Sequence, residues 1–131
     1  MGTNYYTKDR PPCPECGHEE VGEHIGKSSF GWVFLLRVDM KHGPRSLEDW
    51  KAKFSLPGCR IVDEYGKAVT FDEMLKVVTD RSAPGELSSS WYRENYAEPG
   101  PNGLARPSVG RDPHCVGHGE GTWSLVTGEF S

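Results

Sequence analysis

The chain has 131 residues, a length that fits one ordinary domain and is too short for two independent hydrophobic cores. Its 15 Lys and Arg residues nearly balance its 19 Asp and Glu residues, giving a formal net charge of −4 at pH 7. This balance argues against non-specific nucleic-acid binding, which depends on many cations that neutralise phosphates. With 16 glycines and 10 prolines, the chain has few aliphatic residues for a core. We therefore expect aromatic side chains and a cross-link, formed by disulfides or a metal ion, to stabilise the domain.

The expected compartment is the cytoplasm. No apolar stretch approaches the length that crosses a membrane, and the first thirty residues lack the apolar segment of a secretory signal. We therefore expect no membrane partner. In a reducing compartment the four cysteines would serve as metal ligands rather than form disulfides.

The N-terminal third is expected to hold a polar arm and two strands. Residues 1–12 are mostly polar and predict an arm that lies on the domain. Residues 21–25 predict a short strand, and residues 26–29 a polar turn. The continuous apolar run within residues 31–38 predicts a central strand that is covered on both faces.

Two capping-box patterns predict two short helices. The first pattern occupies residues 46–49 and begins a helix that runs to about Phe54. The second occupies residues 70–73 and begins a helix that runs to about Arg81, with apolar residues at helical spacing. Between the helices, residues 60–69 predict a β-hairpin.

The C-terminal part begins with a change of composition. Residues 82–113 are rich in Pro and Gly and predict a long loop within the single domain 1–131, with a helical turn around residues 91–96. Residues 121–130 predict a closing strand. This order of elements predicts an α+β fold with a small mixed or antiparallel sheet and two short helices.

Two pairs of metal-ligand residues stand near the two ends of the chain. Cys13 and Cys16 lie in a Cys-Pro-Glu-Cys-Gly knuckle of the kind found in zinc ribbons. Cys115 and His118 have the same spacing and are also followed by a glycine. We therefore predict one structural Zn²⁺ ion held by Cys13, Cys16, Cys115 and His118, with His24 as an alternative ligand. Free or redox-active thiols remain the other interpretation of the knuckle.

The segment from His24 to Ser29 resembles the end of a phosphate-binding loop. It lacks the first glycine of that loop, and no helix is expected to follow it, so it is no NTPase P-loop. Its imidazole, ammonium and hydroxyl groups would be costly to bury without partners. We predict that His24, Lys27, Ser28 and Ser29 form an exposed surface for an anionic group. The alternative is an ordinary polar turn between two strands.

No catalytic signature stands out in the sequence. Glu120 beside an open zinc site would suit a metal-dependent hydrolase or nuclease, but four protein ligands leave no position for water. The cluster of Trp91, Tyr92 and Arg93, together with Tyr96, is expected to hold the long loop against the domain rather than to stack on a base. We therefore expect a protein that acts by binding and not as an enzyme.

Five motifs spread over most of the chain, except residues 82–113, form a distinctive combination. They are Asn4-Tyr5-Tyr6, the Cys-Pro-x-Cys-Gly knuckle, His24-Ile-Gly-Lys-Ser-Ser29 followed by Gly31-Trp32, the Asp63-Glu-Tyr-Gly66 turn and Gly121-Thr-Trp123. The combination resembles a family of small bacteriophage and prophage proteins. That resemblance implies no specific activity, but it implies a small accessory protein in the cytoplasm of an infected host.

The resemblance leads to two binding hypotheses. In the first, the protein binds a host factor, for example as an inhibitor of an antiviral defence system. In the second, it is a receptor that sequesters a nucleotide or another anionic small molecule. A deep pocket lined by Lys27, Ser28, Ser29 and aromatic residues would favour the small molecule, whereas a flat exposed aromatic patch would favour the protein partner.

Overall fold

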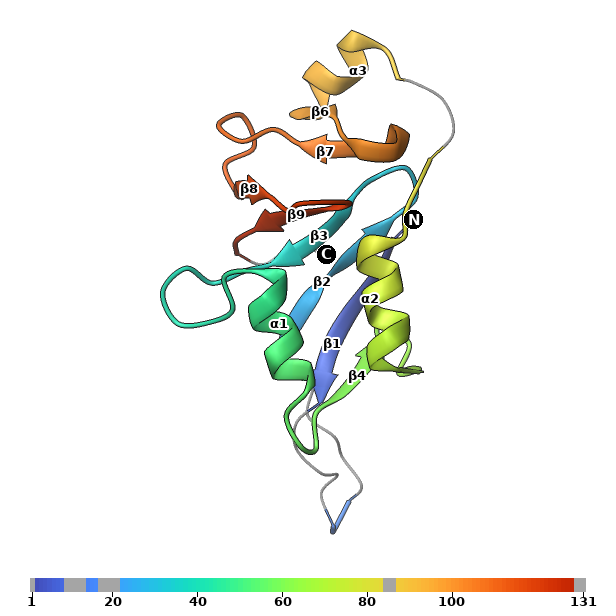
Figure 1. The fold of residues 1–131 in the computed structure, drawn as a ribbon, viewed down its shortest axis with the longest axis vertical. Coiled ribbons are helices and arrows are strands. Elements are labelled where there is room, and N and C mark those ends of the chain that lie inside the picture. The colour runs from blue at the N-terminus through green and yellow to red at the C-terminus, as the bar shows by residue number, and fades with distance from the viewer. Residues whose placement is uncertain (1, 9–13, 17–21, 84–86, 129–131) are drawn as a thin grey trace.

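The computed structural model describes residues 2–8, 14–16, 22–83 and 87–128. Within these ranges the chain forms an α+β fold with one large sheet, one small sheet and three α-helices (Figure 1). The elements in chain order are β1 (Gly2–Lys8), β2 (His24–Ser29), β3 (Phe34–Arg37), α1 (Leu47–Phe54), β4 (Arg60–Asp63), β5 (Ala68–Val69), α2 (Phe71–Thr79), α3 (Ser89–Glu94), β6 (Ala97–Pro99), the 3-10 turn η1 (Pro101–Gly103), β7 (Ala105–Pro107), β8 (Cys115–His118) and β9 (Trp123–Val126).

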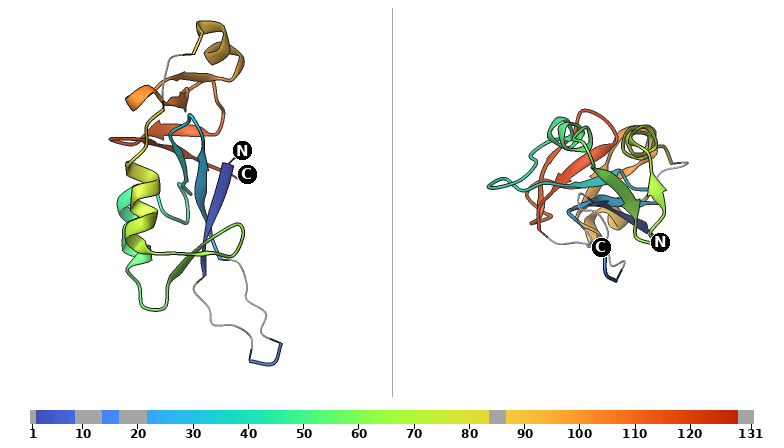
Figure 2. Two further views of the ribbon diagram at one scale, coloured as in Figure 1. Left: turned by 90° about the vertical axis from the view of Figure 1, so that its right-hand side faces the viewer. Right: turned by 90° about the horizontal axis from the view of Figure 1, so that it is seen from below.

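The large sheet has seven strands in the order β5-β4-β1-β2-β3-β9-β8. All neighbouring strands run antiparallel except β3 and β9, which are parallel, so the sheet is mixed. Helices α1 and α2 lie side by side on one face (Figure 2). The expected α+β class and mixed sheet are confirmed, while the expected number of helices is one too low for the described residues.

The N-terminal segment is a strand, and the expectation of a polar arm is wrong. β1 pairs with β2 on one side and with β4 on the other, so it lies inside the sheet. The segment contains Tyr and Thr residues, which are frequent in strands. Tyr5 packs 6.1 Å from the ring of Phe34, and Thr7 is buried. Its polar side chains can be buried because they are hydrogen-bonded: the Asn4 Oδ1 atom, for example, accepts from His24 Nε2 at 2.9 Å.

Residues 26–29, predicted as a turn, continue strand β2. Gly26 allows this because a Cβ at this position would overlap the main-chain oxygen of Leu35 on β3. Gly26 pairs with Leu36 in the antiparallel register. The register between β1 and β2 shifts between Tyr5 and Tyr6, as at a β-bulge. Of the strand predicted at residues 21–25, residue 21 lies outside the described residues.

Both predicted helices are confirmed, together with their caps. In α1 the Ser46 hydroxyl accepts a hydrogen bond from the Asp49 amide at 3.3 Å. In α2 the Thr70 hydroxyl accepts from the Glu73 amide at 3.1 Å, and the Glu73 carboxylate accepts from the Thr70 amide at 3.4 Å. The hairpin between the helices is also confirmed, as β4 and β5.

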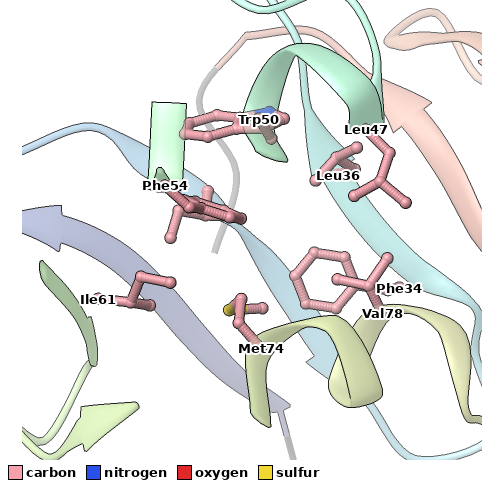
Figure 3. Close-up of a cluster of buried hydrophobic side chains, with 9 residues drawn as sticks. Phe34, Leu36, Leu47, Trp50, Phe54, Ile61, Met74 and Val78 are labelled. Carbon is pink, nitrogen blue, oxygen red and sulfur yellow. The ribbon is translucent and has the colours of Figure 1, made fainter. Parts of the chain in front are cut away.

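The main core lies between these two helices and the sheet (Figure 3). Trp50 is buried in it, and its indole nitrogen donates a hydrogen bond to the main-chain oxygen of Arg37 at 2.7 Å. The buried cluster consists of Ile25, Phe34, Leu36, Leu47, Trp50, Phe54, Ile61, Met74 and Val78. Across the described ranges, no helix is both long and apolar enough to cross a bilayer.

About half of the segment predicted as a long loop, residues 82–113, has regular structure. Helix α3, strands β6 and β7 and the turn η1 form a lobe above the large sheet (Figure 1). Ala105 of β7 joins this lobe to the segment before β3. Its amide donates to the Gly31 oxygen at 2.8 Å, and its oxygen accepts from the Val33 amide at 2.9 Å. Residues 84–86 lie outside the described part of this segment.

Candidate functional site

The sheet face opposite α1 and α2 carries a cavity of about 230 Å³. Leu35 lies on this face because it alternates along β3 with Leu36, which belongs to the core on the helical side. Lys27 pairs with Leu35 in the sheet, so the two residues lie side by side at the cavity. We call it the Lys27 cavity. It is lined by Lys27, Ser29, Trp32, Leu35, Pro107, Asp112, His114 and Val126.

Lys27 and Ser29 reach the cavity together because they lie two residues apart on β2 and so point to the same face. Ser28 points to the helical face, where its side chain hydrogen-bonds to that of Tyr5. Burial there raises the pKa of Tyr5 above its ordinary value, so its hydroxyl stays protonated at neutral pH. Two of the four predicted binding residues therefore share one cavity, and Ser28 is turned away from it.

Gly2 makes room for the Lys27 side chain. Gly2 lies on the neighbouring strand β1, where it pairs with Ser29 of β2. A Cβ at Gly2 would overlap Lys27 Cε and would lie 2.7 Å from Ser29 Oγ. The absence of a side chain at Gly2 thus lets the lysine stem and the serine hydroxyl lie next to each other. Within the described ranges, Lys27 forms no ion pair.

Trp32 forms an aromatic wall of the Lys27 cavity and is held from two sides. Its ring centroid lies 5.5 Å from that of Trp91 in α3, with the planes tilted by 49°. Its main-chain oxygen accepts a hydrogen bond from Arg81 Nε at 3.1 Å. These contacts fix the tryptophan before any ligand enters, which reduces the entropy lost on binding.

Asp112 and His114 lie on the loop after β7 and bring two more titratable groups to the cavity. The Asp112 Oδ1 atom accepts a hydrogen bond from the His114 amide at 3.0 Å. The His114 oxygen in turn accepts from the Thr127 amide at 2.8 Å, which attaches the loop to the end of β9. Among the described residues, the Asp112 Oδ2 atom and the His114 imidazole have no hydrogen-bond partner, so both are available to a ligand.

His24, predicted to be exposed with Lys27, is buried at the opposite end of β2 and does not line the cavity. Its Nε2 atom donates a hydrogen bond to Asn4 Oδ1 at 2.9 Å, and its ring lies 5.1 Å from that of Tyr6. The expectation of exposure is therefore wrong for His24. The hydrogen bond of its Nε2 atom to the neighbouring strand makes this burial tolerable.

The two predicted zinc half-sites are not brought together by the described residues. Cys16 is exposed. Its segment, residues 14–16, lies at the end of the molecule away from β8 (Figures 1 and 2). Its predicted partner Cys13 lies outside the described residues. No group of three or more possible ligands occurs in the described part of the chain. A tetrahedral structural site with all four predicted ligands thus finds no support in this placement.

Cys115 and His118 do lie close to each other, around the main-chain oxygen of Pro107. The His118 Nε2 atom donates to this oxygen at 2.8 Å, and the Cys115 sulfur lies 3.7 Å from it. Burial raises the pKa of the Cys115 thiol, so it stays protonated at neutral pH. These hydrogen bonds account for both side chains without a metal ion.

Six of the residues that line the cavity are not predicted from the sequence as parts of a site: Trp32, Leu35, Pro107, Asp112, His114 and Val126. Trp32, Leu35 and Val126 belong to segments predicted as strands, and the others to the predicted long loop or its flank. Strand alternation would have separated Ser28 from Lys27 once β2 was known to run to Ser29. No local signal would have paired the loop after β7 with β2, because their contact depends on the whole topology.

The chain significantly matches no protein-family model, no curated protein and no solved structure. Its function is therefore inferred from its own residues and their geometry.

Proposed function

We propose that the protein is a receptor that binds an anionic small molecule in the Lys27 cavity without transforming it. The observation that carries this proposal is the convergence of Lys27, Ser29 and Trp32 on one concave surface. A concave, partly apolar site with a few convergent polar groups is typical of small-molecule binding. The cavity of about 230 Å³ has room for part of such a ligand, such as a ring or a charged group, while the rest of the ligand extends into solvent.

The groups in the cavity favour a nucleoside phosphate as the class of ligand. Lys27 and Ser29 would donate hydrogen bonds to phosphate oxygens, and Trp32 would contact the base through its ring. Asp112 is acidic and would repel a bare anion, but its Oδ2 atom would accept a hydrogen bond from a sugar hydroxyl or an exocyclic amine. A ligand that carries an anionic group, an aromatic ring and a hydrogen-bond donor would therefore find a partner for each of its groups among these four side chains.

A protein partner is the second candidate, and one observation favours it. Phe30, between Ser29 and Trp32, is 83% exposed. An exposed aromatic side chain beside a cavity would suit a partner that inserts an acidic side chain next to Lys27. In either case the resemblance to phage proteins supports a setting in which binding withdraws a molecule of the host from its normal role.

The test is a titration with the four common nucleoside monophosphates, followed through the Trp32 indole signal in NMR spectra and by calorimetry. We expect saturable binding of at least one of them and weaker binding of the matching nucleoside. Lys27→Ala should weaken binding roughly 10–100-fold, as for loss of a charge-assisted hydrogen bond. Lys67→Ala, an exposed change of equal charge in the β4–β5 hairpin, should have no effect.

Ser29→Ala and Ser28→Ala form a matched pair, because the two serines are neighbours on opposite faces of β2. Ser29→Ala should weaken binding, and Ser28→Ala should leave it unchanged. Absence of saturable binding for all four nucleotides, or equal affinity of Lys27→Ala and the parent, would overturn the proposal. Binding of an acidic host protein that Lys27→Ala abolishes, without any nucleotide binding, would replace it with the second candidate.

A further inference from the structure

A second, larger cavity of about 570 Å³ lies in the lobe above the large sheet. Helix α3, strand β6 and the turn η1 form its walls, and Arg111 reaches it from the turn after β7. It shares no lining residue with the Lys27 cavity. We call it the Arg111 cavity.

Arg111 is fixed in this cavity by neutral partners. Its Nη2 atom donates hydrogen bonds to the main-chain oxygen of Ala97 and to Ser108 Oγ, the latter at 2.8 Å. Neither partner carries a charge, and no ion pair of Arg111 is formed within the described ranges. No described carboxylate therefore pairs with the guanidinium, and it has further N–H groups for an acceptor.

A second arginine, Arg93, lines the same cavity from the last turn of α3. It is exposed and likewise has no ion pair among the described residues. The cavity also contains a carboxylate, Glu98, but this group is paired with Arg106 at 2.9 Å. Two uncompensated guanidinium groups thus remain, which makes the cavity attractive to an anion.

The rest of the lining is largely apolar or aromatic. Tyr92 contributes its ring from α3, and its ring packs edge-on against Trp91 at 5.4 Å. Leu104, Pro99 and Leu87 add aliphatic surface. An apolar wall opposite charged groups selects a ligand with an apolar body and one anionic end.

From this combination we infer that the Arg111 cavity is a second binding site, for a small molecule with a carboxylate or phosphate group on an aromatic or apolar body. Arginine suits both oxyanions because its planar fork donates two parallel hydrogen bonds. The inference goes beyond the proposed function, because it concerns other residues and another ligand contact. It holds whether or not the Lys27 cavity binds a nucleotide.

The test uses phenyl phosphate and benzoate, with benzyl alcohol as an uncharged control and inorganic phosphate as a control without a ring. Binding is followed in NMR spectra through the Nε–H signals of Arg93 and Arg111. We expect saturable shifts of both signals with phenyl phosphate or benzoate. The ligand that binds more tightly shows whether the cavity prefers a phosphate or a carboxylate. Benzyl alcohol and inorganic phosphate should bind more weakly by roughly tenfold or more.

Three variants make the result specific. Arg93→Gln should weaken binding about tenfold, as for loss of one charged hydrogen bond. Arg45→Gln, which removes an exposed arginine before α1, should not alter it. Lys27→Ala should not alter it either, although it weakens binding at the Lys27 cavity. Shifts that do not saturate, or that persist unchanged in Arg93→Gln, would overturn the inference.

Discussion

Arg81 Nη2 donates a hydrogen bond to the main-chain oxygen of Ser29 at 2.7 Å and so joins the segment after α2 to the end of β2. The Nε atom of the same guanidinium donates a hydrogen bond to the main-chain oxygen of Trp32. Arg81 contributes no lining atom to the Lys27 cavity. It positions two residues that do, and thereby connects the helical layer to the binding face of the sheet.

We predict that Arg81→Ala both destabilises the fold and weakens ligand binding. The loss of the hydrogen bonds to Ser29 and Trp32, and of a longer one to the Val77 oxygen, should lower the free energy of unfolding by about 2–3 kcal/mol, measured by urea denaturation. Binding at the Lys27 cavity should weaken because Ser29 and Trp32 are no longer held in place. Arg81→Lys keeps the charge but not the planar guanidinium group with its several N–H donors. It should therefore restore only part of the stability and only part of the ligand affinity. An Arg81→Ala variant that unfolds and binds like the parent would contradict this role.

A second prediction concerns the close approach of β2 and β3 at Gly26. A Cβ there would overlap the Leu35 oxygen and lie 2.8 Å from Phe34 Cζ, so the strands must move apart in Gly26→Ala. We expect a loss of about 3 kcal/mol in unfolding free energy, at the upper end for overpacked sites. Gly117→Ala is the matched control, because its Cβ would lie 3.8 Å from Leu125 Cδ1, an ordinary contact. Equal stability of the two variants would show that β2 and β3 are not so closely packed.

The elements that could be predicted from the sequence are those with local signals. Ser46 and Thr70 cap their helices through residues three positions further on, and such a pattern is complete within one turn. β1 could not be predicted in this way. Its residues are polar, and what makes them a strand is pairing with β2 and β4 from distant parts of the chain.

The candidate site was predictable only in part for the same reason. Lys27 and Ser29 were identified by their chemistry, because a turn or strand needs neither an ammonium group nor a hydroxyl. Asp112 and His114 reach the same cavity only because β9 pairs in parallel with β3 and places the loop after β7 beside it. Such a contact depends on the order of the strands in the sheet, which no short motif encodes.

A third prediction concerns zinc. If the knuckle of Cys13 and Cys16 binds the ion, Cys16→Ser should lower the zinc content measured by elemental analysis of the purified protein. Cys115→Ser should retain the zinc, because the structure places Cys115 in β8, away from the segment 14–16 (Figure 1). Loss of zinc in both variants would restore the four-ligand site predicted from the sequence. A parent protein without zinc would remove the knuckle as a metal site.

The last prediction is a pH dependence that arises from Glu98 and Arg106. Burial alone would raise the pKa of Glu98, but the hydrogen bond and the charge of Arg106 outweigh it and hold the pKa below its ordinary value of 4.5. A carboxyl group with a lowered pKa stabilises the folded state above its unfolded pKa, and that contribution disappears as the pH falls through the folded value. The side chains of Arg106 and Glu98 are 30% and 35% exposed, so solvent screening limits the contribution. For such a pair we expect a contribution of about 0.5–1 kcal/mol to the free energy of unfolding at neutral pH.

Glu98→Gln should therefore be less stable than the parent at pH 7 and equally stable at a pH well below the lowered pKa of Glu98, where the parent carboxyl is also neutral. Urea denaturation at several pH values measures the difference. Arg106→Gln provides the second arm of a double-mutant cycle, and the double variant shows how much of the effect belongs to the pair. The charge pair joins β6 to β7, so the same cycle also reports on the lobe that carries the Arg111 cavity. A stability difference that persists unchanged at low pH would assign the effect to packing of the side chain and not to its charge.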